Sequence, residues 1–354
     1  MKIKLAILEN DRNYLSRLVN VFTTRYTDKL EVYSFTDEDA ALNALSASRI
    51  NVFLADEVFE IDPKAIPNYC GFAYLTDNSG IESIRDVRAV AKFQKTDLIY
   101  RQILSIHSEN AGSDVTLYQN DDDCKVIAFV SPSGGTGASS AAAACALYLS
   151  RKGKKALYLN LEKLGASDVF FKAEGDFDFS DIIFAVKSKK TNLSLKLESC
   201  VRRDDSGVYF YQPTEVALDM LSFKTEETLT LLSELKISGL FDYVILDMDF
   251  GLDSDTLSIF RQCPVIVLVG DGSVISNSKL QRAVKALNLM EEDNADRLIP
   301  RMHLLFNKFS NKTGTVPAGL ELKPLGGAPR YEHAKPEQII QQIAALTVFD
   351  KILN

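Results

Sequence analysis

One glycine-rich segment constrains the fold of this chain more than any other part of the sequence. Residues 125–149 read KVIAFVSPSGGTGASSAAAACALYL, so an apolar strand runs through a glycine-rich turn into an alanine-rich helix. Glycines let the backbone turn back and direct several N–H groups at a phosphate, and the following helix adds partial positive charge at the same point. A hydroxyl of Ser139 or Ser140 could bind Mg²⁺ beside that phosphate. The segment therefore predicts a phosphate-binding loop in an α/β domain.

The match to the general pattern G-x-x-x-x-G-K-[ST] is incomplete. Pro132 occupies the first glycine position and Ala138 the lysine position. A glycine-rich turn between a strand and a helix can also serve close packing alone. The loop by itself therefore leaves nucleotide binding open.

Both halves of the chain alternate apolar runs with helical patterns. Residues 1–112 contain KIKLAIL, LEVYSF, NVFLAD, GFAYLT and VRAVAKF, and residues 124–354 contain KVIAFV, ALYLNL, GVYFYQ, YVILDM, VIVLVG and MHLLFN. Such alternation implies parallel sheets covered by helices on both faces. We therefore predict an α/β protein with two doubly wound domains, at residues 1–112 and 124–354. The segment 113–123 ends in three consecutive aspartates and breaks the periodicity, so it is the expected linker.

The N-terminal half carries the residue types of a phosphoacceptor site. Glu9 and Asp11 follow the first apolar run, Asp56 ends the third, Thr76 ends the fourth and Lys92 lies in the fifth. This order resembles the receiver domains of response regulators, which have a flavodoxin-like fold. The segments between Asp56, Thr76 and Lys92 are too short or too broken by Pro and Gly for full crossover helices. We therefore predict an atypical receiver-like domain that acts as an interaction module, with phosphorylation of Asp56 as the alternative.

The C-terminal half resembles the MinD/ParA ATPases, which have the P-loop NTPase fold. Their deviant Walker A motif, K-G-G-x-G-K-[ST], aligns with residues 133–139. ALYLNLE places Asn160 and Glu162 at the two acidic positions of the family's switch I segment. FDYVILDMD places Asp247 at the Walker B position, and LLFNK places Asn307 where the family has an asparagine that contacts adenine.

The resemblance implies ATP and Mg²⁺ as cofactors. It implies Ser139 and Asp247 as Mg²⁺ ligands, and as ATP-binding residues Ser133, Gly134, Gly135, Thr136, Gly137, Ala138, Ser139, Ser140 and Asn307.

The departures from the family pattern concern catalysis. In the family, a signature lysine and a P-loop lysine compensate the charge that develops as the γ-phosphoryl group leaves. Ser133 and Ala138 stand at these positions and carry no charge. Each lost charge-assisted hydrogen bond costs about 1.5–3 kcal/mol, which backbone amides and Mg²⁺ offset only in part. We therefore predict ATP binding with weak or no hydrolysis and assign no catalytic residue; an empty relic site is the alternative.

Charge and composition exclude several other classes of protein. The net charge of −8 and pI of about 5.1 disfavour general nucleic-acid binding, which relies on a basic surface. The five cysteines are far apart, as expected of a reduced cytoplasmic protein. The last residues, PEQIIQQIAALTVFDKIL, have helical apolar spacing but few basic residues. We expect this helix to pack on its domain, and membrane association to be at most indirect.

A receiver-like domain followed by a MinD/ParA-like domain resembles the TadZ/CpaE family over essentially the whole chain. The segment AKFQKTDLIYRQIL also resembles the end of that family's receiver-like domains. The resemblance implies an ATP-binding localisation or scaffold protein for tight-adherence (type IVb) pilus assembly and secretion. It also implies a homodimer that recruits pilus and secretion machinery proteins, often at a cell pole. Two alternatives remain: an active ParA/MinD-like partitioning ATPase, and a phosphorylatable response regulator with an ATPase-like output domain.

Overall fold

The computed structural model describes residues 2–110, 124–189, 192–291, 296–320 and 322–353. The chain forms two compact units, one made of Met1–Leu117 with Phe184–Cys200 and the other of Tyr118–Ile183 with Val201–Asn354. The expected linker, 113–123, lies outside the described residues. The boundaries 1–112 and 124–354 therefore remain a prediction.

The first unit contains a sheet with the strand order β2-β1-β3-β4-β6-β5. All its described pairings are parallel except the β5–β6 hairpin. One apolar core lies between this sheet and α1 and α3, and a second lies on the α2 side. The elements are β1 (Ile3–Leu8), α1 (Arg12–Arg25), β2 (Leu30–Phe35), α2 (Glu38–Ala47), β3 (Val52–Asp56), β4 (Gly71–Thr76), β5 (Ser83–Ile84), β6 (Val87–Ala91) and α3 (Thr96–Asn110).

The connections after β3 and β4 contain no α-helix, as the sequence predicts. A single 3₁₀ turn, Pro63–Ala65, lies between β3 and β4, and the short strand β5 lies between β4 and β6. Asp62 caps the 3₁₀ turn by accepting a hydrogen bond from the Lys64 amide at 3.0 Å. Short polar turns thus replace the crossover helices at these two positions.

A segment from the middle of the chain completes the first unit. It contains the end of α5 (Phe179–Ser188) and all of α6 (Leu193–Cys200), which packs against α3. Leu195 is buried in the same apolar core as Ile103. Glu198 pairs with Lys29 at 3.0 Å, and the buried Lys196 Nζ donates to Ser105 Oγ at 3.1 Å. These long-range contacts were not foreseen from the sequence.

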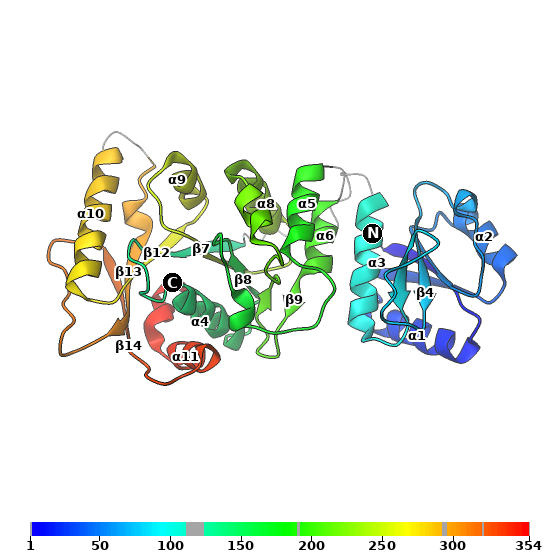
Figure 1. The fold of residues 1–354 in the computed structure, drawn as a ribbon, viewed down its shortest axis with the longest axis horizontal. Helices are drawn as coiled ribbons and strands as arrows, with labels where there is room; N and C mark the ends of the chain where they lie inside the picture. Colours follow the sequence, from blue (N-terminus) through cyan, green and yellow to red (C-terminus); the bar gives the residue numbers. More distant parts are fainter. Residues whose placement is uncertain (1, 111–123, 190–191, 292–295, 321, 354) are drawn as a thin grey trace. The chain divides into compact units, whose positions relative to one another are not determined.

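The second unit contains a sheet with the order β14-β13-β12-β7-β11-β8-β10-β9. Only the β9–β10 pairing is antiparallel among those described. Helices α4 and α11 lie on one face of the sheet, and α8, α9 and α10 lie on the other (Figure 1). The strands are β7 (Lys125–Val130), β8 (Ala156–Asn160), β9 (Arg202–Arg203), β10 (Tyr209–Phe210), β11 (Tyr243–Asp247), β12 (Val265–Gly270), β13 (Met302–Phe309) and β14 (Lys323–Pro329). The helices are α4 (Ala138–Arg151), α7 (Ala217–Ser222), α8 (Thr225–Ile237), α9 (Ser254–Arg261), α10 (Val274–Met290), α11 (Pro336–Ile343) and α12 (Asp350–Leu353).

The central strand β7 delivers the glycine-rich segment to the middle of the sheet. Ile127 and Phe129 pack on the almost fully buried helix α4. The C-terminal residues Ile340, Ile343 and Phe349 belong to the same core, so the C-terminal helix packs on its own domain as expected. In the described part of the chain, no helix has the length and apolar character needed to cross a membrane.

Two doubly wound α/β units are therefore confirmed. The expected strands of both halves are present, although the predicted GVYFYQ strand is reduced to β10. Strands β9 and β14 were not predicted. The sequence of β14, KPLGGAP, contains prolines and glycines that are poor strand formers.

Candidate nucleotide-binding site

The glycine-rich segment connects β7 to α4 at the carboxyl edge of the second sheet. Gly135 and Gly137 have left-handed backbones, with φ of 79° and 83°, and glycine adopts such angles without steric cost. Gly137 immediately precedes α4 and offers no side-chain oxygen to its first turn. The first N–H groups of α4 are therefore available to an anion.

Two neighbouring strands hold this loop in place. Ser131 Oγ donates a hydrogen bond to the Val269 carbonyl of β12 at 2.6 Å. From β13, Asn307 Nδ2 donates to the carbonyl of Thr136 at 2.9 Å and to that of Gly137 at 3.2 Å. Polar contacts from non-adjacent segments thus maintain the loop geometry.

A group of polar side chains meets the loop at the ends of β8 and β11. Asp247 Oδ2 accepts hydrogen bonds from Tyr158 OH at 2.7 Å and from Asn160 Nδ2 at 2.9 Å. Asn160 Nδ2 also lies 3.2 Å from Glu162 Oε2, which accepts from Ser139 Oγ at 3.4 Å. The fold therefore brings Ser139, Glu162 and Asp247 together beside the loop.

Asp247 is fully buried, and its surroundings favour the protonated acid. Burial, together with the nearby Glu162 carboxylate, raises the pKa of Asp247 to about 7, while the hydrogen bond from Tyr158 opposes the shift. Its second oxygen, Oδ1, has no hydrogen-bond partner among the described residues. A divalent cation would supply this oxygen with a partner and stabilise the ionised carboxylate.

The donor set fits a Mg²⁺ ion bound together with a nucleotide. Mg²⁺ prefers oxygen ligands and takes one or two from the protein, with phosphates and water completing its shell. Asp247 Oδ1 and Ser139 Oγ are oxygen atoms on the loop side of the sheet that could act as Mg²⁺ ligands. These residues are those assigned to the metal from the sequence, and that role stays a proposal.

The remaining predicted ATP-binding residues all lie in the loop or beside it. Ser133 is buried, and its amide donates a hydrogen bond to Ser131 Oγ at 3.2 Å. Thr136 is also buried, whereas Ser140 is half-buried in the first turn of α4. Asn307 is buried, and its side-chain amide nitrogen donates a hydrogen bond to the loop carbonyl of Thr136. A contact between Asn307 and adenine remains a prediction.

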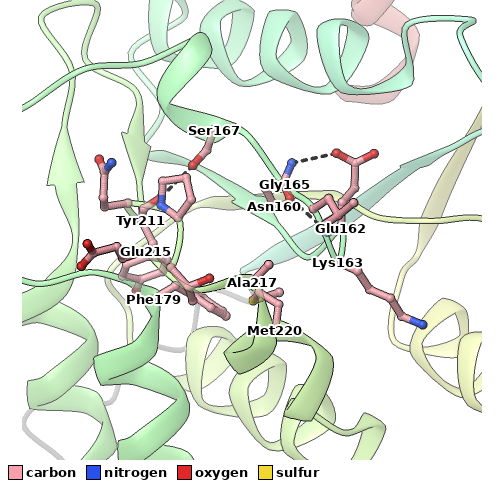
Figure 2. A pocket seen from close by; sticks show the side chains of 14 residues that line it. Asn160, Glu162, Lys163, Gly165, Ser167, Phe179, Tyr211, Glu215, Ala217 and Met220 are labelled. Carbon is pink, nitrogen blue, oxygen red and sulfur yellow. Dashed lines mark hydrogen bonds between the residues drawn. The ribbon is translucent and has the colours of Figure 1, made fainter.

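A cavity of about 230 Å³ lies beside this polar group. Figure 2 shows Asn160 and Glu162 on one side of it and Phe179, Tyr211 and Glu215 on the other. The residues on the second side were not predicted from the sequence. No motif marks them, because they follow the short strand β10 or begin α5 and meet Asn160 only in the folded sheet.

The first unit assembles most of the expected phosphoacceptor residues. Lys92 Nζ lies 3.1 Å from Asp56 Oδ2 and 3.1 Å from Glu9 Oε2, and all three side chains are buried. Burial raises the pKa of Glu9 to about 7, helped by a hydrogen bond to Asp56. Asp11 is instead the N-cap of α1, accepting hydrogen bonds from the amides of Asn13 and Tyr14 at 2.8 and 3.2 Å. The expected acidic pair is therefore divided between the buried cluster and a helix cap.

Known proteins match the two halves of the chain separately. A family model described as the TadZ-like receiver domain matches residues 1–108. A ParA family ATPase from Chlorobium tepidum is 18% identical with a TM-score of 0.50, and the match covers 66% of this chain and 94% of that one. The MinC:MinD cell division complex of Aquifex aeolicus is 16% identical with a TM-score of 0.50, covering 65% and 96%. No curated protein matches the sequence.

The loop and the sheet order first define a class: the second unit has the P-loop fold of the ParA and MinD ATPases. Residues 1–108, which form most of the first unit, are similar to the TadZ-like receiver domains. The chain thus has the domain pairing of the TadZ/CpaE family, a receiver-like domain followed by a MinD/ParA-like domain.

Proposed function

We propose that this protein is an ATP-binding localisation and scaffold protein for tight-adherence (type IVb) pilus assembly and secretion, with weak or no ATP hydrolysis. One observation carries the proposal: the glycine-rich loop keeps the glycines of the family pattern and has Ser139 and Asp247 nearby, but it has no lysine of its own. Ser133 and Ala138 stand at the two lysine positions. The family pairing of a receiver-like and a ParA/MinD-like domain supports the pilus role.

Several features support nucleotide binding at this loop. The backbone amides of 134–139 and the N-terminus of α4 would hold the phosphates. Ser139 and Asp247 would hold Mg²⁺, which would neutralise phosphate charge when bound. The structurally similar Chlorobium protein is an ATPase of the ParA family. These contributions act on the bound state and require no lysine.

The loop lacks the two lysines that support rapid phosphoryl transfer in the family pattern. The transition state spreads negative charge over the departing phosphoryl group, and cations placed beforehand provide most of its stabilisation. Ser133 is buried, its backbone amide is bonded to Ser131 within the loop, and its side chain carries no charge. Ala138 carries a methyl group only. Glu162 could orient a water molecule, but neither loop position from which the family's lysines lower the barrier carries a cation.

The proposal is tested by measuring ATP affinity and turnover on the same protein. Wild-type protein is expected to bind ATP with Mg²⁺ below millimolar concentration and to release phosphate at close to the background rate. Substitution Ala138→Lys is expected to tighten ATP binding about tenfold or more, since a charge-assisted hydrogen bond contributes about 1.5–3 kcal/mol. Ala138→Met, which has similar length and no charge, serves as the control.

Three results would contradict the proposal. Steady-state turnover comparable to that of MinD-type ATPases would show that the site is catalytic. Absence of any ATP affinity at millimolar nucleotide would show that the loop is a relic. If the Ala138→Lys and Ala138→Met variants bind ATP with equal affinity, a side chain at position 138 does not reach the phosphates.

We further propose that the second unit dimerises through the edge that carries the loop. Leu164 after β8, Leu218 in α7 and Val274 at the start of α10 are all exposed, with 81%, 69% and 79% of their surface accessible. These residues follow parallel strands at their carboxyl ends, so they share one edge of the sheet. Exposed apolar residues gathered around a site are typical of an interaction surface. ATP retained at this edge would stabilise the dimer by mass action.

The two alternative functions receive less support. A partitioning ATPase needs a DNA-binding surface, and the net charge of −8 opposes one. A phosphorylatable response regulator needs an accessible acceptor. Asp56 is buried, and Asp11 caps α1 instead of joining the buried cluster, which favours an interaction module.

A further inference from the structure

Two consecutive residues of β13 both reach the glycine-rich loop. Asn307 Nδ2 bonds the Thr136 carbonyl at 2.9 Å, and Lys308 Nζ bonds the Gly135 carbonyl at 2.8 Å. In a regular strand, successive side chains point to opposite faces of the sheet. A regular strand could therefore not bring both side chains to the same loop.

An irregularity in the backbone of β13 explains how both side chains reach it. Lys308 has a left-handed conformation with φ of 57°. The pairing of β13 with β14 also shifts register between Phe306 and Phe309. Such a bulge redirects a side chain, and bulges are frequent next to functional sites. A non-glycine residue held in this conformation is strained, which is a reason to look for a function.

The redirected side chain brings a positive charge to a loop without one. Lys308 is the only Lys or Arg side chain in the described part of the chain with a hydrogen bond to residues 131–137. Its Cε would lie 3.3 Å from a Cβ placed on Gly137. The alkyl chain therefore passes over Gly137, and the ammonium group ends at Gly135. Lys308 is also exposed, as a residue that contacts a ligand from solvent must be.

We propose that Lys308 supplies the cation that Ser133 and Ala138 do not, by contacting the polyphosphate of a nucleotide bound at the loop. The inference rests on the proposed ATP binding. A lysine ammonium has three donors on a flexible stem. One N–H can keep the Gly135 carbonyl while the others donate to phosphate oxygens. Lys308 thus stabilises bound ATP from a neighbouring strand, whereas the lysines of the family pattern lie within the loop.

The test compares Lys308→Met with Lys308→Arg and with Lys312→Met. Lys312 is exposed four residues further along, so its substitution removes the same charge away from the loop. Displacement of a fluorescent ATP analogue in the presence of Mg²⁺ gives the Kd for ATP at low and at high salt. Lys308→Met is expected to raise this Kd at low salt by about tenfold or more. Lys308→Arg and Lys312→Met are expected to stay within about threefold of wild type, and the effect of Lys308→Met should shrink at high salt.

A purely structural role for Lys308 would give a different pattern. If Lys308 only supports the loop, Lys308→Met should weaken binding equally at both salt concentrations and lower the melting temperature of the nucleotide-free protein. That pattern, or an unchanged Kd in Lys308→Met, would overturn the inference and leave the proposed ATP binding standing. No ATP binding by the wild-type protein would overturn both.

Discussion

Asp247 shows how burial decides the charge of a single residue. Its carboxyl group ends a fully buried strand, and the pKa rises from 3.8 to about 7 because burial penalises the ionised form. The partners of Oδ2 are the Tyr158 hydroxyl and the Asn160 amide, which donate hydrogen bonds but bring no positive charge. In nucleotide-free protein, Asp247 therefore titrates near neutral pH.

This shift predicts that stability depends on pH in a defined direction. The unfolded chain loses the Asp247 proton near pH 3.8, whereas the folded chain keeps it up to about pH 7. The folded state then binds more protons in this window, so the free energy of unfolding falls as pH rises from about 4 to about 7. The loss is a few kcal/mol at most, at about 1.4 kcal/mol per pKa unit.

Urea unfolding of nucleotide-free protein at pH 5 and at pH 7.5 measures this effect. Asp247→Asn is expected to lose less stability than wild type between these two values, because the amide does not titrate. Some dependence should remain, since burial also raises the pKa of Glu9 to about 7. Glu9→Gln is therefore the matched control. An identical pH dependence in wild type and Asp247→Asn would refute the assignment.

At the scale of elements, the loop and α4 depend on one glycine for two reasons. Gly137 has a left-handed backbone, and a Cβ at this position would overlap Asn307 Nδ2. Gly153, at the other end of α4, also has a left-handed backbone, with φ of 76°, but a Cβ there would meet nothing within 4 Å. Alanine at Gly153 therefore tests backbone strain alone, whereas alanine at Gly137 adds steric overlap with Asn307.

We predict different costs for alanine at these two glycines. Gly153→Ala is expected to lower the free energy of unfolding by about 1 kcal/mol, the ordinary cost of a left-handed non-glycine residue. Gly137→Ala is expected to cost about 1–3 kcal/mol more and to abolish ATP binding, because Asn307 must release the loop carbonyls. Urea unfolding and ATP titration check both. Equal costs would mean that the Asn307 contact does not constrain the loop.

At the scale of the whole molecule, the proposed dimer makes the state of assembly depend on nucleotide. ATP with Mg²⁺ is expected to convert monomer to dimer in sedimentation experiments. Leu164→Asp and Leu218→Glu should each weaken that dimer at least about tenfold, because a buried unpaired carboxylate is costly. Leu289→Glu is the control, since Leu289 is comparably exposed near the other end of α10. Dimers that form equally well in all three variants would exclude this edge as the interface.

The local features of both units could be predicted from the sequence. Strand and helix periodicity, the glycine-rich turn and the missing crossover helices depend on residues that are neighbours in the chain. The positions of Ser139 and Asp247 follow from the same local logic, because each lies at a strand end or helix start. Their meeting follows because the carboxyl ends of adjacent parallel strands share one edge of the sheet.

Other features were decided only by the tertiary structure. Helix α6 joins the first unit through Leu195 and Glu198, although it follows α4 and β8 in the chain. Lys308 reaches Gly135 only because β13 contains a bulge beside β14. These contacts link residues more than 90 positions apart, as in the case of Lys29 with Glu198 and Lys308 with Gly135. Sequence periodicity reports which face of an element is apolar, but the partner that covers this face is set by strand order and packing across the whole sheet.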